Sequence, residues 1–211
     1  MKIKLLTFII MFTVVCLMGF FGIKTAYAQK NTYFNSYYVG INGGIAQATP
    51  NGLSSTSGGT INLSIGKNFN LNNFIIGGEA MLGYANNGSW TDNNFDEYGD
   101  NAILSVHSWY YAVALKAGYA IKNIMPFIKL GYIEYKYNGN ISYSGQYSSY
   151  YYYLNAPTSI FINANGLLYG IGLEYMINKN WGLTAQYFGT LLNASGEVHM
   201  NNYTIGLSYN F

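Results

Sequence analysis

The C-terminal stretch Tyr203-Thr-Ile-Gly-Leu-Ser-Tyr-Asn-Phe211 decides the fold class of this sequence. Large apolar or aromatic residues occupy every second position: Tyr203, Ile205, Leu207, Tyr209 and Phe211. Small or polar residues stand between them. Because successive side chains of a strand point to opposite faces, this segment has one apolar and one polar face. Such strands build transmembrane β-barrels, whose outer surface meets lipid. An antiparallel edge strand of a soluble sheet alternates in the same way.

Seven further segments upstream share this alternation. They cover residues 37–46, 60–69, 74–85, 107–120, 126–137, 160–177 and 181–190. Three tight links, at 70–73, 121–125 and 178–180, alternate with four longer connections near 47–59, 86–106, 138–159 and 191–202. Outer-membrane barrels typically have an even number of strands, with short periplasmic turns and long external loops in alternation. The sequence therefore predicts an all-β fold, an eight-stranded antiparallel up-and-down transmembrane β-barrel.

The composition of the two faces favours a membrane barrel over a soluble one. A soluble lipocalin-like barrel carries its apolar side chains inside. Here the face opposite the large apolar side chains consists mainly of Gly, Asn, Ser and Thr, with a few charges. That face is expected to line the interior. For the same reason, we do not expect an apolar channel for hydrophobic solutes.

Residues 1–28 have the organisation of a secretory signal peptide. Two lysines precede an apolar run over residues 5–21, and an A-x-A cleavage motif ends at Ala28. The alternative is a retained membrane helix, because the apolar run is almost long enough to span a bilayer. The cleavage motif favours removal of the segment, which leaves residues 29–211 as the barrel domain. Cys16, the only cysteine, would leave with the signal peptide, so no disulfide is expected.

The overall composition supports this class. Charged residues make up 9% of the chain and aromatic residues 18%, whereas a soluble domain usually carries about a quarter charged residues. After residue 28 no apolar run approaches the ~20 residues of a transmembrane helix. Seven lysines and eight acidic residues follow residue 28. A nucleic-acid-binding surface would be basic, so nucleic acid is not an expected partner.

Four charged residues occupy inward positions by strand parity: Glu79, Lys116, Lys129 and Glu174. Counted from the periplasmic turns, Glu79 and Lys116 lie at one height, and Lys129 and Glu174 at another. Residues at equal heights on neighbouring antiparallel strands meet, so we expect these two pairs. The lumen of an eight-stranded barrel is just wide enough for side chains to fill. An unpaired buried charge costs several kcal/mol, so a paired plug is expected.

Six stretches carry a resemblance to a known family. They are residues 38–44, 76–80, 115–119, 127–131, 170–175 and 205–211, each with glycine or small residues among apolar and aromatic ones. In this order and spacing the sequence resembles the small eight-stranded outer-membrane proteins typified by the outer membrane protein A barrel and the opacity-type adhesins. The resemblance implies a monomer in the cell outer membrane, in contact with lipid and lipopolysaccharide and without a cofactor.

The resemblance also implies roles for particular residues. The aromatic end of strand 203–211 resembles the signal by which the barrel assembly machinery recognises its clients. In such barrels the inward charges form a network that exchanges partners and opens a narrow pore, with a basic residue on the seventh strand. The matching position here is Thr184, with neutral Gln186 one step higher. We therefore expect Glu79 to be left with Lys116 alone and the lumen to be plugged, the alternative being a small ion-permeable pore.

The external connections offer candidate binding residues. The 138–159 connection carries Tyr143, Tyr147, Tyr150, Tyr151, Tyr152 and Tyr153 among Ser and Asn. Tyrosine among small polar residues makes adaptable binding surfaces, as in antibody loops. A surface protein that adheres to a host or matrix ligand is therefore expected, unless these tyrosines only extend the aromatic girdle. The acidic residues of the 86–106 connection lack the spacing of a known calcium loop, so no metal site is expected.

A lipid A-modifying enzyme is the alternative from a different class. Some small outer-membrane barrels act on lipid A through a Ser-His pair with an acid, and His107 and His199 are the available bases. Ser108 follows His107 directly, so the two side chains point to opposite faces of a strand. His199 has Ser195 and Glu197 nearby. Geometry is the first criterion for a catalytic group, and we expect no enzymatic activity.

Overall fold

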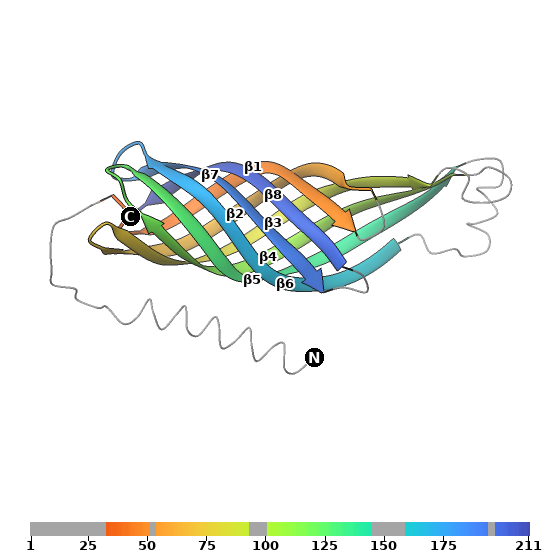
Figure 1. The fold of residues 1–211 in the computed structure, drawn as a ribbon. Coiled ribbons are helices and arrows are strands. Elements are labelled where there is room, and N and C mark those ends of the chain that lie inside the picture. The colour runs from red at the N-terminus through yellow and green to blue at the C-terminus, as the bar shows by residue number, and fades with distance from the viewer. Residues whose placement is uncertain (1–32, 51–53, 93–100, 145–158, 194–196) are drawn as a thin grey trace.

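The computed structural model describes residues 33–50, 54–92, 101–144, 159–193 and 197–211. Within these residues, eight strands form a closed barrel in which sequence neighbours pair antiparallel and the last strand pairs with the first (Figure 1). The strands are β1 (Tyr37–Pro50), β2 (Thr56–Leu71), β3 (Phe74–Asp92), β4 (Asn101–Tyr119), β5 (Ile124–Ser144), β6 (Ser159–Met176), β7 (Trp181–Asn193) and β8 (Glu197–Asn210). The predicted fold class is confirmed. The predicted signal peptide lies outside the described residues.

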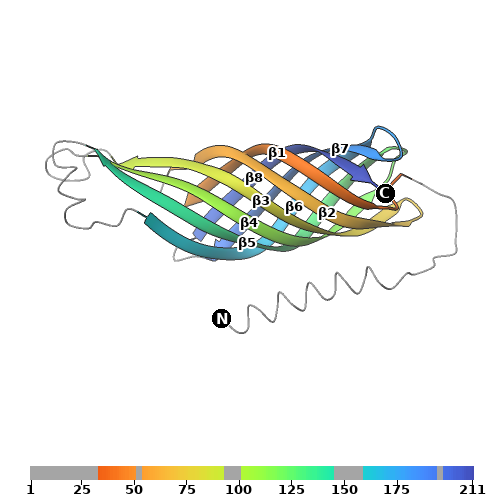
Figure 2. The ribbon, with the colours of Figure 1, turned by 180° about the vertical axis from the view of Figure 1, so that it is seen from behind.

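The strands run further than predicted at the end with the longer connections. β3 and β4 have 19 residues each and β5 has 21, against the ~9–11 that cross a membrane. These three strands project beyond the rest of the barrel (Figures 1 and 2). Residues 86–92, 101–106 and 138–144, predicted as loop, belong to them. The prediction was wrong there because Asn, Gly and Ser interrupt the apolar face while the backbone pairing continues, for example Ile103 with Ser142.

The large apolar side chains face outward, as the alternation predicted. Ile205 is 72% exposed, and Ile128 and Ile171 are 61% exposed. The residues between them are mostly buried in the lumen. An apolar surface of this extent fits a lipid environment rather than water.

Two belts of aromatic side chains ring the outer surface. The inner belt, near the short turns, contains the ring pairs Tyr37–Phe211, Phe74–Tyr119 and Trp181–Tyr209, with centroids 6.3, 5.1 and 5.1 Å apart. The outer belt contains the pairs Tyr84–Trp109 and Tyr187–Tyr203, at 5.3 and 5.2 Å. Aromatic side chains of this kind mark the two membrane–water interfaces of a barrel.

Tight turns close the strands at the end that also holds the C-terminus (Figure 1). Ile121 and Ile124 exchange backbone hydrogen bonds of 2.8 and 3.0 Å around a two-residue turn. Its first residue, Lys122, has a φ of 57°, and Asn72 in the β2–β3 turn has a φ of 66°. Positive φ values match hairpin turns to the strand twist. No helix of the described residues is long and apolar enough to cross a membrane.

Candidate functional site

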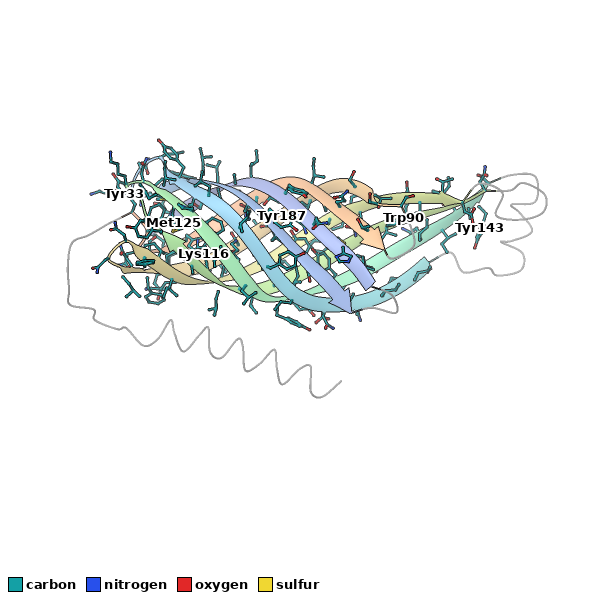
Figure 3. The ribbon with its side chains drawn as sticks, in the orientation of Figure 1. Tyr33, Trp90, Lys116, Met125, Tyr143 and Tyr187 are labelled. Atoms are coloured by element: carbon teal, nitrogen blue, oxygen red, sulfur yellow. The ribbon has the colours of Figure 1, made fainter. Side chains whose placement is uncertain are left out.

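Four charged side chains from four consecutive strands meet inside the lumen. They are Glu79 on β3, Lys116 on β4, Lys129 on β5 and Glu174 on β6. None is more than 4% exposed. Lys116 lies in the half of the barrel near the short turns (Figure 3). We call these four residues the ionic layer.

The ion pairs of the ionic layer differ from the predicted ones. The Lys116 ammonium lies 3.2 Å from a carboxylate oxygen of Glu174. Lys129 forms the other ion pair, with Glu79. Each pair therefore skips one strand of the barrel. The predicted pairs, Glu79 with Lys116 and Lys129 with Glu174, were wrong.

The strand register explains the difference. Lys116 stands directly opposite Lys129, whereas Glu79 stands opposite Ala114 and Glu174 opposite Met125. Strands in a barrel are inclined and their register is staggered around the ring. Heights counted from separate turns are therefore not comparable between hairpins. Each long lysine side chain extends past the adjacent strand to a carboxylate on the strand beyond it.

Two uncharged groups complete the ionic layer. The Tyr38 hydroxyl donates a hydrogen bond of 2.6 Å to Glu79, and Lys129 donates one of 2.6 Å to the Gln186 side-chain oxygen. The expectation that Glu79 pairs with Lys116 alone was therefore wrong. The Lys116 ammonium lies 4.4 Å from the centre of the Tyr38 ring, a cation–π contact. Sequence reasoning missed Tyr38, although its inward parity was visible.

An aromatic layer fills the lumen on the outer side of the ionic layer. Tyr110 lies with its ring centroid 5.1 Å from Tyr135 and 6.1 Å from Phe188. All three side chains are fully or almost fully buried. Ile133 and Leu168 belong to the same buried cluster. This part of the lumen is closed by apolar and aromatic packing.

The inward-facing residues therefore differ in kind between two sides of the barrel. The expectation of Gly, Asn, Ser and Thr holds for most inward positions of β1, β2 and β8, although Tyr38 and Met200 also point inward there. On these strands Asn42 donates a hydrogen bond of 2.9 Å to Asn62. It was wrong for β4, β5 and β6, whose inward positions include Tyr110, Tyr135 and Leu168. These strands carry large residues on both faces, so a strict alternation of apolar and polar residues is absent there.

Glycines make room for the two inward tyrosines. A Cβ atom on Gly66 would lie 2.5 Å from the Tyr38 ring, and one on Gly83 would lie 2.2 Å from the Tyr110 ring. Both distances are well below a normal contact between carbon atoms. Tyr38 and Tyr110 therefore reach into the lumen only because the neighbouring strands lack side chains at these positions.

A third cluster closes the end with the short turns. Phe34, which precedes β1, is fully buried against Ile75, Met125 and Met176. Side chains thus fill the lumen in three successive layers: this apolar cluster, the ionic layer and the aromatic layer.

The remaining candidate residues divide between described and undescribed parts of the chain. Tyr203, Ile205, Leu207, Tyr209 and Phe211 all face outward and are 40–72% exposed. Tyr143 lies near the outer end of β5. Tyr147 and Tyr150–Tyr153 lie outside the described residues, as do Asp96, Glu97 and Asp100 of the acidic connection.

Neither histidine forms a hydrogen bond with a serine among the described residues. Ser108 is fully buried in the lumen, whereas the His107 ring lies 6.0 Å from the outward Tyr84 ring. His199 is exposed, and Ser195 lies outside the described residues. In the part of the chain that the structure describes, no three His, Cys, Asp or Glu side chains lie together as metal ligands.

The closed ring of antiparallel strands, its lipid-facing surface and its aromatic belts define a bacterial outer-membrane protein. The chain belongs to the outer membrane protein beta-barrel domain family, whose model matches residues 12–211. No curated protein matches the sequence.

Solved structures of outer-membrane barrels share the fold. Ail, the attachment invasion locus protein of Yersinia pestis, is 20% identical, with a TM-score of 0.55, over 84% of this chain and 99% of that chain. OprG from Pseudomonas aeruginosa is 12% identical, with a TM-score of 0.55, over 86% and 99%. Neisserial surface protein A is 14% identical, with a TM-score of 0.52, over 83% and 97%. At these identities the similarity shows the common barrel alone.

Proposed function

We propose that this outer-membrane barrel is a surface protein whose external end binds a host or matrix ligand while its lumen stays closed. The observation that carries the proposal is the extension of β3, β4 and β5 beyond the outer belt. From Lys136, opposite the belt residue Trp109, β5 continues to Ser144, about 25 Å along the strand. A barrel that only crosses the membrane needs no such extension.

The extended strands support a connection suited to binding. Tyr143 stands near the end of β5, and Tyr147 and Tyr150–Tyr153 follow in the next connection. Tyrosines present large, rigid contact area with a hydrogen-bonding hydroxyl, and the surrounding Ser and Asn adapt to polar groups.

The charges of the external connections limit the chemical class of ligand that this surface can bind. Ail has been crystallised with the heparin analogue sucrose octasulfate, a polyanion. In this chain residues 86–106 carry four acidic residues and no lysine, and residues 138–159 carry no charge. Repulsion between like charges disfavours a sulfated ligand here. A protein or an uncharged glycan fits this surface better.

Replacement of the tyrosines tests the proposal. Bacteria that express the chain with Tyr147 and Tyr150–Tyr153 changed to Ser should lose adherence to immobilised matrix glycoproteins. A matched variant, in which Asp96, Glu97 and Asp100 become amides, should keep it. Heat-modifiable gel mobility would establish that both variants form barrels. Undiminished adherence of the tyrosine variant would contradict the proposal.

A narrow ion pore is the alternative function, and one observation favours it. Lys116 and Lys129 are neighbours, so each ammonium lies in the same layer as both Glu79 and Glu174. An exchange of partners would rearrange the ionic layer without leaving a charge unpaired. The aromatic layer would also have to open before ions could pass.

A further inference from the structure

An apolar cavity of about 240 Å³ lies at the outer end of the lumen. We call it the outer cavity. Its wall comes from six strands and includes Ala48, Trp90, Leu104, Val106, Ile162 and Val198. The indole nitrogen of Trp90 donates a hydrogen bond of 2.8 Å to the Ser54 carbonyl, which fixes the ring in the wall. Trp90 lies in the outer half of the barrel, away from Lys116 (Figure 3).

The aromatic layer forms the floor of the outer cavity. Tyr137, which lines the cavity, stacks on Tyr135 of the aromatic layer with ring centroids 5.5 Å apart and an angle of 13° between the rings. The cavity is therefore separated from the ionic layer by packed rings. A molecule that enters from outside would stop here.

Two buried polar atoms in the wall lack a hydrogen-bond partner among the described residues. They are the side-chain oxygen of Asn87 and the hydroxyl of Tyr137. The Asn87 amide nitrogen donates to Ser108 at 2.9 Å, and Ser108 stands directly opposite Tyr137 on the neighbouring strand. The Asn87 side chain thus lies at the level of the Tyr137 backbone, and both residues line the outer cavity. Buried polar atoms normally have a hydrogen-bond partner, so we infer that a polar group of a ligand pairs with these two atoms.

We propose that the outer cavity binds a small, largely apolar molecule that carries one hydroxyl group. A hydroxyl donates to the Asn87 oxygen and accepts from the Tyr137 hydroxyl, so it satisfies both atoms at once. A cavity of about 150 Å³ holds benzene, so this one accommodates about ten non-hydrogen atoms. No charged side chain of the described residues lines the cavity, which disfavours an ionic ligand. The proposal does not depend on the adhesive function.

Trp90 provides an internal reporter for the test. The probe is 4-iodophenol, with iodobenzene as its matched counterpart without the hydroxyl, because iodine quenches indole fluorescence on contact. The full barrel is placed in lipid nanodiscs as a Trp109→Phe/Trp181→Phe variant, which keeps Trp90 alone. A Trp90→Phe/Trp109→Phe variant keeps only Trp181, which is 46% exposed on the lipid-facing surface. It reports partition of the probe into the bilayer.

Binding should give saturable quenching of Trp90 by 4-iodophenol and a linear, unsaturated response of Trp181. Ala48→Phe fills the cavity and should abolish the saturable phase. Tyr137→Phe should weaken binding of 4-iodophenol about fivefold to tenfold, the effect of one lost hydrogen bond, and should leave the affinity for iodobenzene within twofold.

Equal responses of Trp90 and Trp181, or saturation that persists in Ala48→Phe, would overturn the proposal. If Ala48→Phe does not fold, Tyr137→Phe still decides, because equal weakening of both probes would also overturn it.

Discussion

Lys116 and Lys129 stand directly opposite each other on β4 and β5, with both side chains buried in the lumen. Like charges placed directly across a strand pair destabilise it unless each finds a counter-charge. Glu174 supplies one from β6, and Glu79 supplies the other from β3. The two ion pairs therefore interleave, and together they connect four consecutive strands across the lumen.

Removal of one lysine should destabilise the barrel strongly. Lys129→Met leaves the Glu79 carboxylate buried with the Tyr38 hydroxyl as its one bonded partner among the described residues. An uncompensated buried charge lowers the free energy of unfolding by about 3–5 kcal/mol. Urea unfolding of the barrel refolded in lipid measures this change. Lys179→Met, the same substitution in an exposed turn, should stay within about 0.5 kcal/mol of the parent.

Double-mutant cycles should identify the partner of Glu79. Glu79→Gln combined with Lys129→Met should show a coupling free energy of about 1.5–3 kcal/mol, because each single change removes the same ion pair. Glu79→Gln combined with Lys116→Met should show a smaller coupling free energy, since Lys116 forms its ion pair with Glu174. A larger coupling of Glu79 to Lys116 than to Lys129 would contradict the observed pairing.

The aromatic layer should keep the lumen closed when the ionic layer is disturbed. In planar bilayers Glu79→Ala should conduct no more than the parent barrel, because Tyr110, Tyr135 and Phe188 still fill the lumen. Glu79→Ala combined with Tyr135→Ala should conduct, because both layers are then open. Wide or frequent openings of Glu79→Ala alone would instead favour the pore function.

Because Tyr110 lies so close to Gly83, alanine substitutions at Gly83 and Gly59 should differ clearly in their effect on stability. Gly83→Ala places a Cβ atom 2.2 Å from a ring held between Tyr135 and Phe188. Overpacking of this kind lowers the free energy of unfolding by about 1–3 kcal/mol. Gly59→Ala is the control, because a Cβ atom there meets no atom within 4 Å. Equal stabilities of the two variants would argue against the packed position of Tyr110.

The fold could be predicted from the sequence because the lipid-facing surface imposes a period of two on every strand. Residues such as Ile128, Ile171 and Ile205 had to alternate with inward residues whatever the interior contained. The lengths of β3, β4 and β5 could not be predicted in the same way. Beyond the outer belt, water can contact both faces, so the pattern fades while the hydrogen bonds continue.

The ionic layer could be predicted only in part. Parity places Glu79, Lys116, Lys129 and Glu174 inside, but the stagger between neighbouring hairpins decides which of them meet. That stagger depends on how the whole ring closes, from β8 back to β1, and no single strand encodes it. The aromatic layer was missed for a different reason, because Tyr110 and Tyr135 lie among outward aromatic residues and do not stand out in the pattern.

Phe211 and Phe74 form a matched pair for testing the proposed assembly signal. Both side chains are 63% exposed and contact aromatic neighbours in the inner belt: Phe211 stacks on Tyr37 and Tyr209, and Phe74 meets Tyr119 edge to face. If the assembly machinery reads the C-terminal aromatic residue, Phe211→Ala should reduce the heat-modifiable barrel in cellular outer membranes severalfold, and Phe74→Ala should not. Refolded in micelles, the variants should lose about 0.5–1.5 kcal/mol of unfolding free energy for each ring contact removed, which is one contact for Phe74→Ala and two for Phe211→Ala. Equal yields of the two variants in cells would show that Phe211 acts only as a residue of the inner belt.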